Sequence, residues 1–337
     1  MKLGLLGAGA VGRLHANAAA GLANVDVVAV CSLSSAEAGG LAAPHGAAVF
    51  TDHRAMLENG LDAVIISTPH ALHAEMVRDA AAAGVHVLVE KPMATSVEDC
   101  DRIIDACESA GVALAVGHIQ HFLPDQVAAR QAVQDGQIGA PIMVHEYRST
   151  DYRPGTRPGW FLDPSIAGGG AVMNIGSHGI DRSSWLVDSL PASVDSAATW
   201  SRFGVGVETD AIAHLRTANG VQVSLTVTST SPVPFNEVTV VGDQGTIVAA
   251  PSRGTLLRAG DTKRTLHEPT SGDIPTAFRN QLAAFADLVA SGSAFPVSTR
   301  LSRAVIGTVL GIYEAARTER PVVIDVGAEP VGAQLRS

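Results

Sequence analysis

Short apolar runs alternate with amphipathic segments along the N-terminal third of the chain. This alternation is typical of a parallel sheet whose strands are joined by crossover helices. The apolar runs predict strands at residues 2–6, 25–31, 47–50, 63–67, 85–89 and 112–116. The segments between them predict helices at residues 11–21, 71–83 and 97–110, the last with Ser96 as its N-cap and Gly111 as its stop.

After Gly117 the pattern changes to polar–apolar alternation broken by tight turns such as Asn219-Gly220. Alternation and short turns favour a mostly antiparallel sheet. Strands are expected at residues 142–149, 194–203, 209–216, 221–228, 237–241 and 321–325. Helices are expected at residues 126–135, 171–186, 277–291 and 299–318, and a loop rich in Pro, Gly and Arg at residues 151–170.

The composition is that of an ordinary globular chain: the 337 residues are 46% hydrophobic, enough for two domain cores. The formal net charge of −10 argues against binding of nucleic acid, whose phosphates require a basic face.

No apolar run reaches the roughly 20 residues that a membrane span needs. Glycines interrupt the apolar segment at residues 3–11. We therefore interpret this segment as a strand and turn, not as a signal peptide. Cys31, Cys100 and Cys107 form no C-x-x-C pair, and we expect a reducing, cytoplasmic location.

A G-x-G-x-x-G segment joins the first predicted strand to the first predicted helix. In this context Gly7 permits a tight turn, Gly9 lets the backbone approach a pyrophosphate, and Gly12 lets helix and strand pack closely. The free N–H groups of the helix N-terminus then face the phosphates. The alternative is a glycine turn without a ligand. We predict that a dinucleotide is bound by Gly7, Ala8, Gly9, Ala10, Val11 and Gly12.

The residue expected at the adenosine ribose lies ~20 positions after this segment, at Ser32. An acid there would hold the ribose 2′-hydroxyl and repel a 2′-phosphate, but residues 31–35 contain none. They also lack the arginine that usually receives a 2′-phosphate. The sequence therefore admits NAD or NADP, with a slight preference for NADP.

Further motifs follow the later strands. They are Thr68-Pro69-His70 with His73, Glu90-Lys91-Pro92, residues 117–122, the glycines at 168–170, residues 174–178 with Asp181, and residues 240–246. With these motifs the chain resembles, from Lys2 to about Ile324, the glucose–fructose oxidoreductase / inositol dehydrogenase / MocA (Gfo/Idh/MocA) family. The resemblance implies an α/β chain with an N-terminal Rossmann NAD(P)-binding domain, taken as residues 1–118. It implies a C-terminal α+β domain, residues 119–337, with an open, mostly antiparallel sheet for substrate binding and oligomerisation.

The resemblance also implies hydride transfer between nicotinamide and a secondary alcohol or ketone of a sugar, sugar derivative or cyclic polyol. It implies that Lys91 contacts nicotinamide and substrate, that the Lys91–Pro92 bond is cis, and that the chain forms a homodimer or homotetramer. The remaining cofactor contacts are expected from Ser32, Thr68, Pro69, His70, His73 and Glu90.

His178 and Asn174 match the family's proton-handling pair, and their i, i+4 spacing puts both on one side of a helix. The glycines ahead of them allow close backbone approach to a ligand. Asn174 replaces the usual carboxylate, so either Lys91 or His178 can be the principal proton carrier.

Substrate contacts are expected from His118, Tyr147, Arg153, Trp160, Asn174 and His178. The aromatic and arginine residues suit stacking on sugar rings, although a surface loop that packs on its own tryptophan explains them equally well. His70 and His73 have no third ligand nearby in sequence, so no metal site is expected. Two other functions are considered: an NAD-dependent glycosidase of the same fold, and a non-enzymatic NAD(P)-binding regulatory protein, which would need no Lys–His pair.

Overall fold

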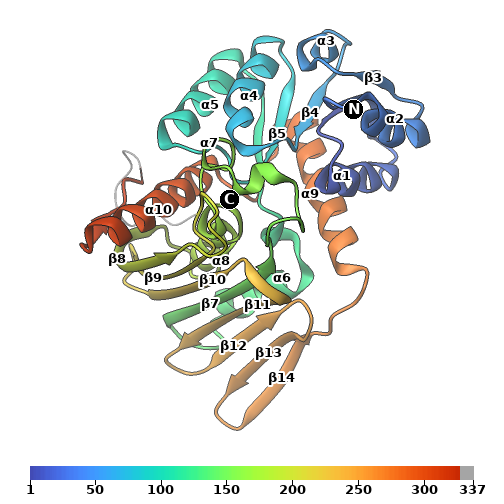
Figure 1. Cartoon of the computed structure of the whole chain (residues 1–337). Coiled ribbons are helices and arrows are strands. Elements are labelled where there is room, and N and C mark those ends of the chain that lie inside the picture. The colour runs from blue at the N-terminus through green and yellow to red at the C-terminus, as the bar shows by residue number, and fades with distance from the viewer. Residues whose placement is uncertain (327–337) are drawn as a thin grey trace. The chain divides into compact units, whose positions relative to one another are not determined.

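The computed structural model describes residues 1–326, which form two compact units (Figure 1). The first unit comprises Met1–Phe122 and Gly272–Thr299, and the second comprises Leu123–Ser271 and the segment that begins at Arg300. The segment Gly272–Thr299 groups with the first unit, although the sequence placed it after the boundary at residue 118. Within residues 1–326, no helix combines the length and apolar character needed to cross a membrane.

The first unit is built on a six-stranded parallel sheet with the order β3-β2-β1-β4-β5-β6. The strands are β1 (Lys2–Leu6), β2 (Asp26–Cys31), β3 (Ala48–Phe50), β4 (Ala63–Ile66), β5 (His86–Glu90) and β6 (Leu114–Gly117). The order reverses direction between β1 and β4, and dinucleotides bind outside the carboxyl ends of the strands at such a reversal. The expected Rossmann domain is therefore confirmed.

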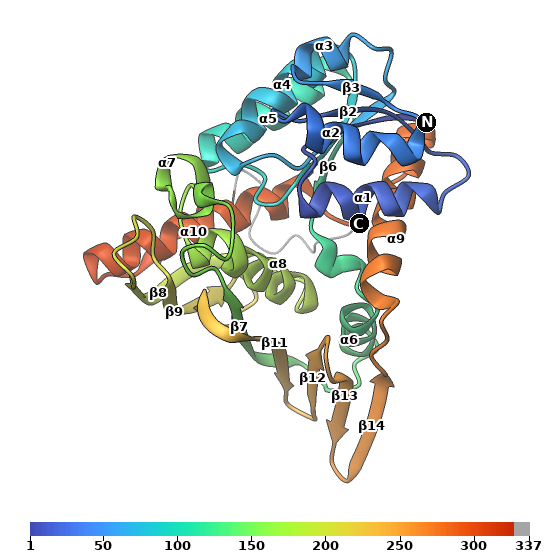
Figure 2. The same cartoon turned by 45° about the vertical axis from the view of Figure 1, so that its right-hand side comes forward.

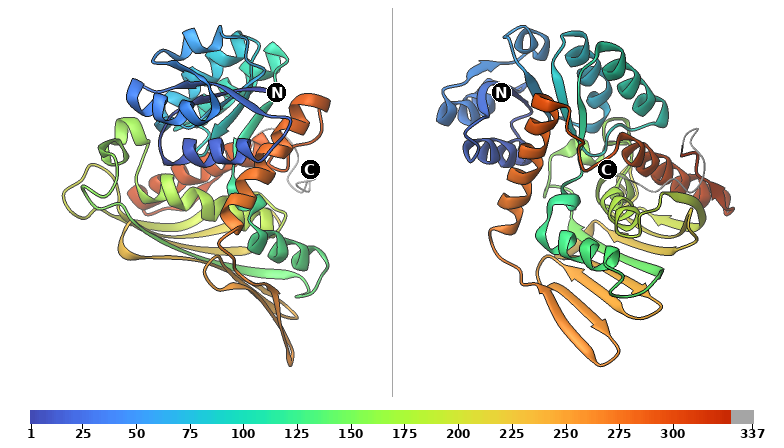
Figure 3. Two further views of the ribbon diagram at one scale, coloured as in Figure 1. Left: turned by 90° about the vertical axis from the view of Figure 1, so that its right-hand side faces the viewer. Right: turned by 180° about the vertical axis from the view of Figure 1, so that it is seen from behind.

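Helices pack on this sheet, with α1 beside α9 and α4 beside α5 (Figure 3). The helices are α1 (Ala10–Ala20), α2 (Ser35–Ala42), α3 (His53–Leu57), α4 (His73–Ala82), α5 (Val97–Ala110) and α9 (Asp273–Ser291). The prediction for α5 is confirmed at both ends, because Ser96 Oγ accepts the N–H of Asp99 at 3.1 Å and Gly111 has a φ of 66°. Helices α2 and α3 were not predicted from the sequence.

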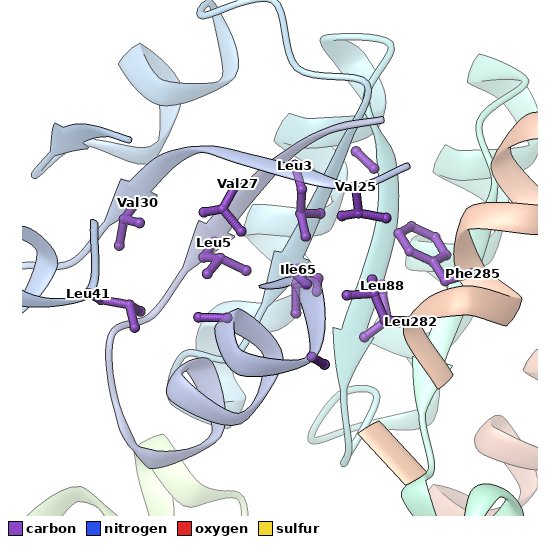
Figure 4. Close-up of a cluster of buried hydrophobic side chains, with 14 of the residues drawn as sticks. Leu3, Leu5, Val25, Val27, Val30, Leu41, Ile65, Leu88, Leu282 and Phe285 are labelled. Atoms are coloured by element: carbon purple, nitrogen blue, oxygen red, sulfur yellow. The ribbon is translucent and has the colours of Figure 1, made fainter. Parts of the chain in front are cut away.

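Helix α9 belongs to the Rossmann core despite its late position in the chain. Leu282 and Phe285 of α9 are buried against Leu3 and Leu5 of β1 and Leu88 of β5 (Figure 4). Burying one such side chain contributes about 1.5–3 kcal/mol. The helix is therefore a structural part of the first unit.

The second unit contains a nine-stranded sheet with the order β14-β13-β12-β11-β7-β10-β9-β8-β15 (Figure 2). Only β7 and β10 pair in parallel, so the expected mostly antiparallel sheet is confirmed. The strands are β7 (Pro141–Asp151), β8 (Pro191–Trp200), β9 (Asp210–Thr217), β10 (Gln222–Thr228), β11 (Thr230–Gly242), β12 (Thr246–Ala250), β13 (Gly254–Ala259), β14 (Thr262–His267) and β15 (Val322–Val323). Strands β12, β13 and β14 were not predicted from the sequence.

Helices α6 (Pro124–Gln134), α8 (Ser177–Leu186) and α10 (Thr299–Thr318) lie along one face of this sheet (Figure 2). A short helix, α7 (Pro164–Ala167), interrupts the loop that follows β7. The predicted helix at residues 171–186 is not uniform, because Val172–Gly176 is a π-helical segment that runs into α8. Such segments appear frequently at functional sites.

The opposite face of the nine-stranded sheet exposes apolar side chains. Tyr147 of β7, Ile212 of β9 and Trp200 of β8 are 42%, 52% and 48% exposed. Tyr147 and Ile212 are both in register with Thr226 of β10, so they share one face. Among the described residues no helix covers this face, which we call the open face.

Candidate active site

The glycine turn after β1 has the geometry that a dinucleotide requires. Gly7 has a φ of +112°, and a Cβ there would lie 2.6 Å from Ser67 O. A Cβ on Gly12 would lie 2.1 Å from Gly7 O, so only glycine allows α1 to start this close to the turn. A Cβ on Gly9 would meet nothing within 4 Å. Gly7 and Gly12 are thus required by the protein itself, whereas Gly9 leaves its backbone open to a ligand.

The N-terminus of α1 has no side-chain cap among the described residues. Gly9 is its N-cap, and the first turn carries no acid. The first N–H groups of a helix have no partner within the helix, and with the helix dipole they attract phosphate. Ala8 is buried, whereas Gly9, Ala10 and Val11 are exposed at this end. The residues present therefore fit the pyrophosphate of a dinucleotide.

A carboxylate from α2, Glu37, lies beside the end of β2 and was not predicted as part of the site. Ser32 Oγ lies 3.4 Å from Glu37 Oε2, and Ser34 Oγ caps α2 by accepting the N–H of Glu37. Because α2 starts directly after β2, its first turn brings Glu37 back beside Ser32. The fixed count of ~20 residues that identified Ser32 could not reveal an acid contributed by the next helix.

The loop after β5 holds Lys91 in a cis Lys91–Pro92 peptide, as expected. Glu90 is buried, and its Oε2 accepts the N–H of Lys91 at 3.2 Å. Its Oε1 lies 2.8 Å from Nε2 of His15, a fully buried residue of α1. A Cβ on Gly117 would lie 2.8 Å from the same carboxylate, so glycine is needed there. Glu90 thus connects α1 to the backbone of Lys91, and His15 was not predicted from the sequence.

His73 supports the same loop from its other side. It is fully buried, with Nδ1 2.9 Å from Pro92 O and Nε2 2.9 Å from Thr68 O. Burial lowers the pKa of His73, so the neutral ring donates to one of the two carbonyl groups. Expected as a cofactor contact, His73 instead lies between the segments that follow β4 and β5. Its packing fixes the positions of both segments.

The other residues predicted near the cofactor surround this loop. Thr68 and Pro69 are half-buried, and the Thr68 hydroxyl donates to Met76 Sδ at 3.2 Å. His70 is buried, with its ring centroid 6.0 Å from that of His73. His118 follows β6 and is 1% exposed. It was predicted to contact substrate, and the structure places it inside the first unit.

Asn174 and His178 occupy successive turns of one helical segment. Asn174 is buried in the π-helical segment, and His178 is the second residue of α8 and half-buried. Behind them Arg182 is fully buried and donates through Nε to Glu146 Oε1 at 2.9 Å and through Nη1 to Asn236 Oδ1 at 2.9 Å.

Glu146 is the buried acceptor that fixes α8 to β7. A second contact joins Arg182 Nη2 to Glu146 Oε2, so the pair is bidentate. Burial raises the pKa of Glu146, while the guanidinium opposes that shift. A Cβ on Gly179 would lie 2.8 Å from Leu225 Cδ1, so glycine lets α8 lie close to β10. These contacts fix the rotation of the helix that carries His178.

The glycines that precede Asn174 have a different role from the one expected. A Cβ on Gly169, whose φ is +153°, would lie 2.1 Å from Tyr313 Oη. A Cβ on Gly170 would lie 1.8 Å from Glu208 O. The close approach that these glycines allow is therefore to the protein itself. The expectation that they open the backbone to a ligand is wrong for Gly169 and Gly170.

The loop after β7 packs largely on itself. The Trp160 ring stacks on Phe161 with centroids 3.7 Å apart, and Phe161 lies 5.2 Å from Tyr152. Exposed Arg153 forms a bidentate ion pair with Asp151. These contacts match the alternative of a loop that packs on its own tryptophan.

Tyr147 and Arg148 are consecutive on β7 and therefore face opposite sides of the sheet. Tyr147 lies on the open face, away from α8, although it was predicted to contact substrate. Arg148 shares the face of Glu146, and burial followed by nearby Arg182 lowers its pKa to about 9. Its Nη1 is buried without a hydrogen-bond partner among the described residues. The alternation of β7 is the signal that could have identified Arg148.

One group of potential metal ligands lies elsewhere in the first unit. Ligand atoms of His53, Glu75 and Asp79 lie within 4.8 Å of one another. Arg54 already pairs with both carboxylates, at 2.7 Å and 2.9 Å. The guanidinium offsets part of the charge that would attract a cation and occupies both carboxylates, so we assign no metal to this group.

Known proteins resemble both units. Residues 1–118 match the family model of the Gfo/Idh/MocA oxidoreductases with an NAD-binding Rossmann fold, and residues 127–248 match the Gfo/Idh/MocA C-terminal domain. An inositol 2-dehydrogenase of Rhizobium meliloti (strain 1021) is 28% identical over 302 residues, which cover 87% of this chain and 90% of the relative. A D-xylose 1-dehydrogenase (NADP(+)) of Haloferax volcanii is 28% identical over 340 residues, which cover 96% of this chain and 100% of the relative.

A solved structure extends the similarity to the whole fold. The WlbA dehydrogenase of Bordetella pertussis, in complex with NADH and UDP-GlcNAcA, is 25% identical with a TM-score of 0.84. The match covers 96% of this chain and 98% of that one.

Proposed function

Because this chain belongs to the Gfo/Idh/MocA family of NAD(P)-dependent oxidoreductases, we propose that it oxidises or reduces a sugar, sugar derivative or cyclic polyol. The reaction is hydride transfer between nicotinamide C4 and a secondary alcohol or ketone carbon. The observation that carries the proposal is the loop after β5, in which buried Glu90 and His73 hold Lys91 at the carboxyl edge of the parallel sheet. Ligands of such sheets bind at that edge.

The dinucleotide is held by backbone and by a few side chains. The turn from Gly7 to Gly12 and the start of α1 receive the pyrophosphate, and Ser32 lies beside the adenosine ribose. Thr68, Pro69 and His70 border the cofactor. When bound, nicotinamide supplies the carbon that accepts or donates the hydride.

Cofactor choice depends on Glu37 in this proposal. A carboxylate beside Ser32 can accept a hydrogen bond from a ribose 2′-hydroxyl, and it repels a 2′-phosphate. The slight preference for NADP inferred from residues 31–35 alone is therefore replaced by a preference for NAD.

His178 and Lys91 divide the proton chemistry. During oxidation His178 accepts the hydroxyl proton, while Lys91 orients the hydroxyl and stabilises negative charge on the oxygen that becomes a carbonyl. Asn174 contributes an uncharged amide instead of a carboxylate, so in this role it can only form hydrogen bonds. Arg148, which presents a buried donor on the α8 side of β7, is a further candidate for substrate contact.

The open face is proposed as a contact with a second copy in a homodimer or homotetramer. Tyr147, Ile212 and Trp200 are large apolar side chains on one sheet face, and such patches mark interaction sites. Sedimentation velocity at micromolar concentration tests this assembly, and a monomer would contradict it.

The function is tested by a cofactor-reduction screen across cyclic polyols, sugars and nucleotide sugars, with NAD and NADP supplied separately. Wild type is expected to form reduced cofactor with at least one of these classes, and Lys91→Ala is expected not to. Glycoside cleavage with no net reduced cofactor would favour the glycosidase instead. Cofactor binding without turnover of any substrate class would favour the regulatory protein.

A further inference from the structure

Four backbone N–H groups open the helical segment that carries Asn174 and His178. The N–H of Asn174 donates to Gly170 O at 3.0 Å, one turn back along the segment. The N–H groups of residues 170–173 therefore lie in the first turn, where a helix offers no acceptor. A buried N–H group left without an acceptor destabilises the fold.

Glu208, two residues before β9, accepts three of these groups. Its Oε2 accepts the N–H of Gly170 at 2.8 Å, and its Oε1 accepts the N–H of Val172 at 2.8 Å. Its backbone carbonyl accepts the N–H of Ala171 at 3.0 Å. A carboxylate at a helix start also interacts favourably with the helix dipole. One residue thus satisfies three consecutive donors.

Tyr313 of α10 accepts the fourth. Its hydroxyl oxygen accepts the N–H of Met173 at 3.2 Å, and its O–H donates to Glu208 Oε1 at 2.9 Å. Burial and the nearby carboxylate raise the pKa of Tyr313 well above its ordinary value, so the hydroxyl keeps its proton. We call this closed set of hydrogen bonds the Glu208–Tyr313 clamp.

The clamp occupies the space that Gly169 and Gly170 leave open. A helix start satisfied in this way has no N–H groups left for an anionic ligand. The clamp also fixes the helical segment at the end nearest Asn174, while the Glu146–Arg182 pair fixes it four residues beyond His178. The segment is thus held on both sides of the two residues.

We propose that Glu208 and Tyr313 are positioning residues for the reaction, which they support by holding the backbone that places Asn174 and His178. This inference rests on the proposed function. It adds that a residue 30 positions along the chain from His178, and another on α10, set the rate without touching substrate.

The test compares Glu208→Gln and Tyr313→Phe with matched controls on the full chain. Glu208→Gln would place an amide NH₂ against an N–H or O–H group that now donates to a carboxylate oxygen. Tyr313→Phe would leave the N–H of Met173 without its acceptor. The first control, Asp125→Asn, removes another buried carboxylate whose pKa burial raises, on α6. The second, Thr308→Val, removes another buried hydroxyl of α10, which donates to Ala304 O.

Wild-type turnover is measured first, because it tests the proposed function alone. The clamp variants are then expected to lower kcat by about 10- to 100-fold, with substrate KM and cofactor Kd within about twofold, since misplacement by ~1 Å can cost ~10²-fold. The controls should keep the wild-type kcat. Hydrogen exchange of residues 170–178, which needs no substrate, should increase in the clamp variants only.

A purely structural clamp would give a different pattern. Faster exchange with an unchanged kcat would overturn the positioning role, because the helix start would then matter only for stability. Unchanged exchange and unchanged kcat would overturn the clamp itself. An equal loss of kcat in the controls would also contradict the proposal, because it would reflect general destabilisation.

Discussion

Helix α1 and the π-helical segment that runs into α8 both start beside closely spaced glycines, but the two glycine runs have different roles. At α1 the turn packs on itself through Gly7 and Gly12, and the backbone at Gly9 stays open. Before α8 the protein's own atoms approach Gly169 and Gly170, and Glu208 and Tyr313 satisfy the first N–H groups.

The difference teaches how to interpret a glycine run. Glycine permits a close approach to the backbone, but it does not show whether the partner is a ligand or a distant part of the same chain. At α1 the helix start remains available to phosphate. Before α8 it is already satisfied, so in the proposed reaction we expect substrate recognition through side chains such as His178.

The largest expected effect is a loss of turnover when His178 or Lys91 is replaced. His178→Ala should lower kcat at least ~100-fold, because a general base contributes ~10²–10⁴-fold, while cofactor affinity changes little. Lys91→Ala should lower kcat by a similar factor. Steady-state kinetics and a direct cofactor titration of each variant check this. Turnover of His178→Ala near the wild-type rate would make that histidine structural.

Stability should be sensitive to substitution in one glycine run and insensitive to it in the other. Gly170→Ala should destabilise the fold by about 1–3 kcal/mol, because its Cβ would overlap Glu208 O. Gly9→Ala should leave the free energy of unfolding almost unchanged, since its Cβ meets nothing within 4 Å. Urea denaturation of the cofactor-free proteins measures both. Equal destabilisation would remove the distinction between the runs.

The next prediction concerns the preference for NAD over NADP in the first unit. Glu37→Ala should improve NADP binding relative to NAD by about 10-fold, because the repulsion of a 2′-phosphate is lost. Ser32→Asp should act in the opposite direction. Fluorescence titration with both reduced cofactors tests the pair, and an unchanged ratio in Glu37→Ala would show that Glu37 does not face the ribose.

The smallest expected effect is a pH dependence of opposite sign in the two regions. Burial lowers the pKa of His73 in the folded state. Its contribution to the free energy of unfolding is therefore present above the unfolded pKa of about 6.5 and is lost as pH falls toward the folded pKa. Glu208 has a raised pKa, so its contribution is present below about 4.3 and is lost as pH rises through the folded value.

Each contribution changes by at most about 1.4 kcal/mol per pH unit. His73→Gln and Glu208→Gln should each remove one of these slopes from the free energy of unfolding measured between pH 4 and pH 8. A slope that survives its own substitution would contradict the assignment.

Much of the fold could be predicted because its signals are local. The strands of the first sheet are continuous apolar runs, and α5 carries its own cap and stop at Ser96 and Gly111. By contrast, β14 (Thr262–His267) was missed because it is a polar edge strand with no buried side. Alternation is informative only where one face is buried.

The candidate site was predicted where motif residues act through their own backbone, as at Gly7 and Gly12. It was not predicted where the partner is distant in sequence. Tyr313 lies 105 residues from Glu208, and His15 lies 75 residues from Glu90. No local pattern marks such pairs. They become visible only when tertiary packing brings the side chains together.

The most direct test of this account is a titration of NADH into wild type, Gly9→Val and Gly170→Ala. A valine at Gly9 keeps an ordinary backbone, with φ at −73°, but puts a side chain where we propose that the pyrophosphate binds. The account predicts micromolar binding by wild type, a loss of at least ~100-fold in Gly9→Val, and near wild-type affinity for the folded fraction of Gly170→Ala. Wild-type affinity in Gly9→Val, or an equal loss in both variants, would contradict it.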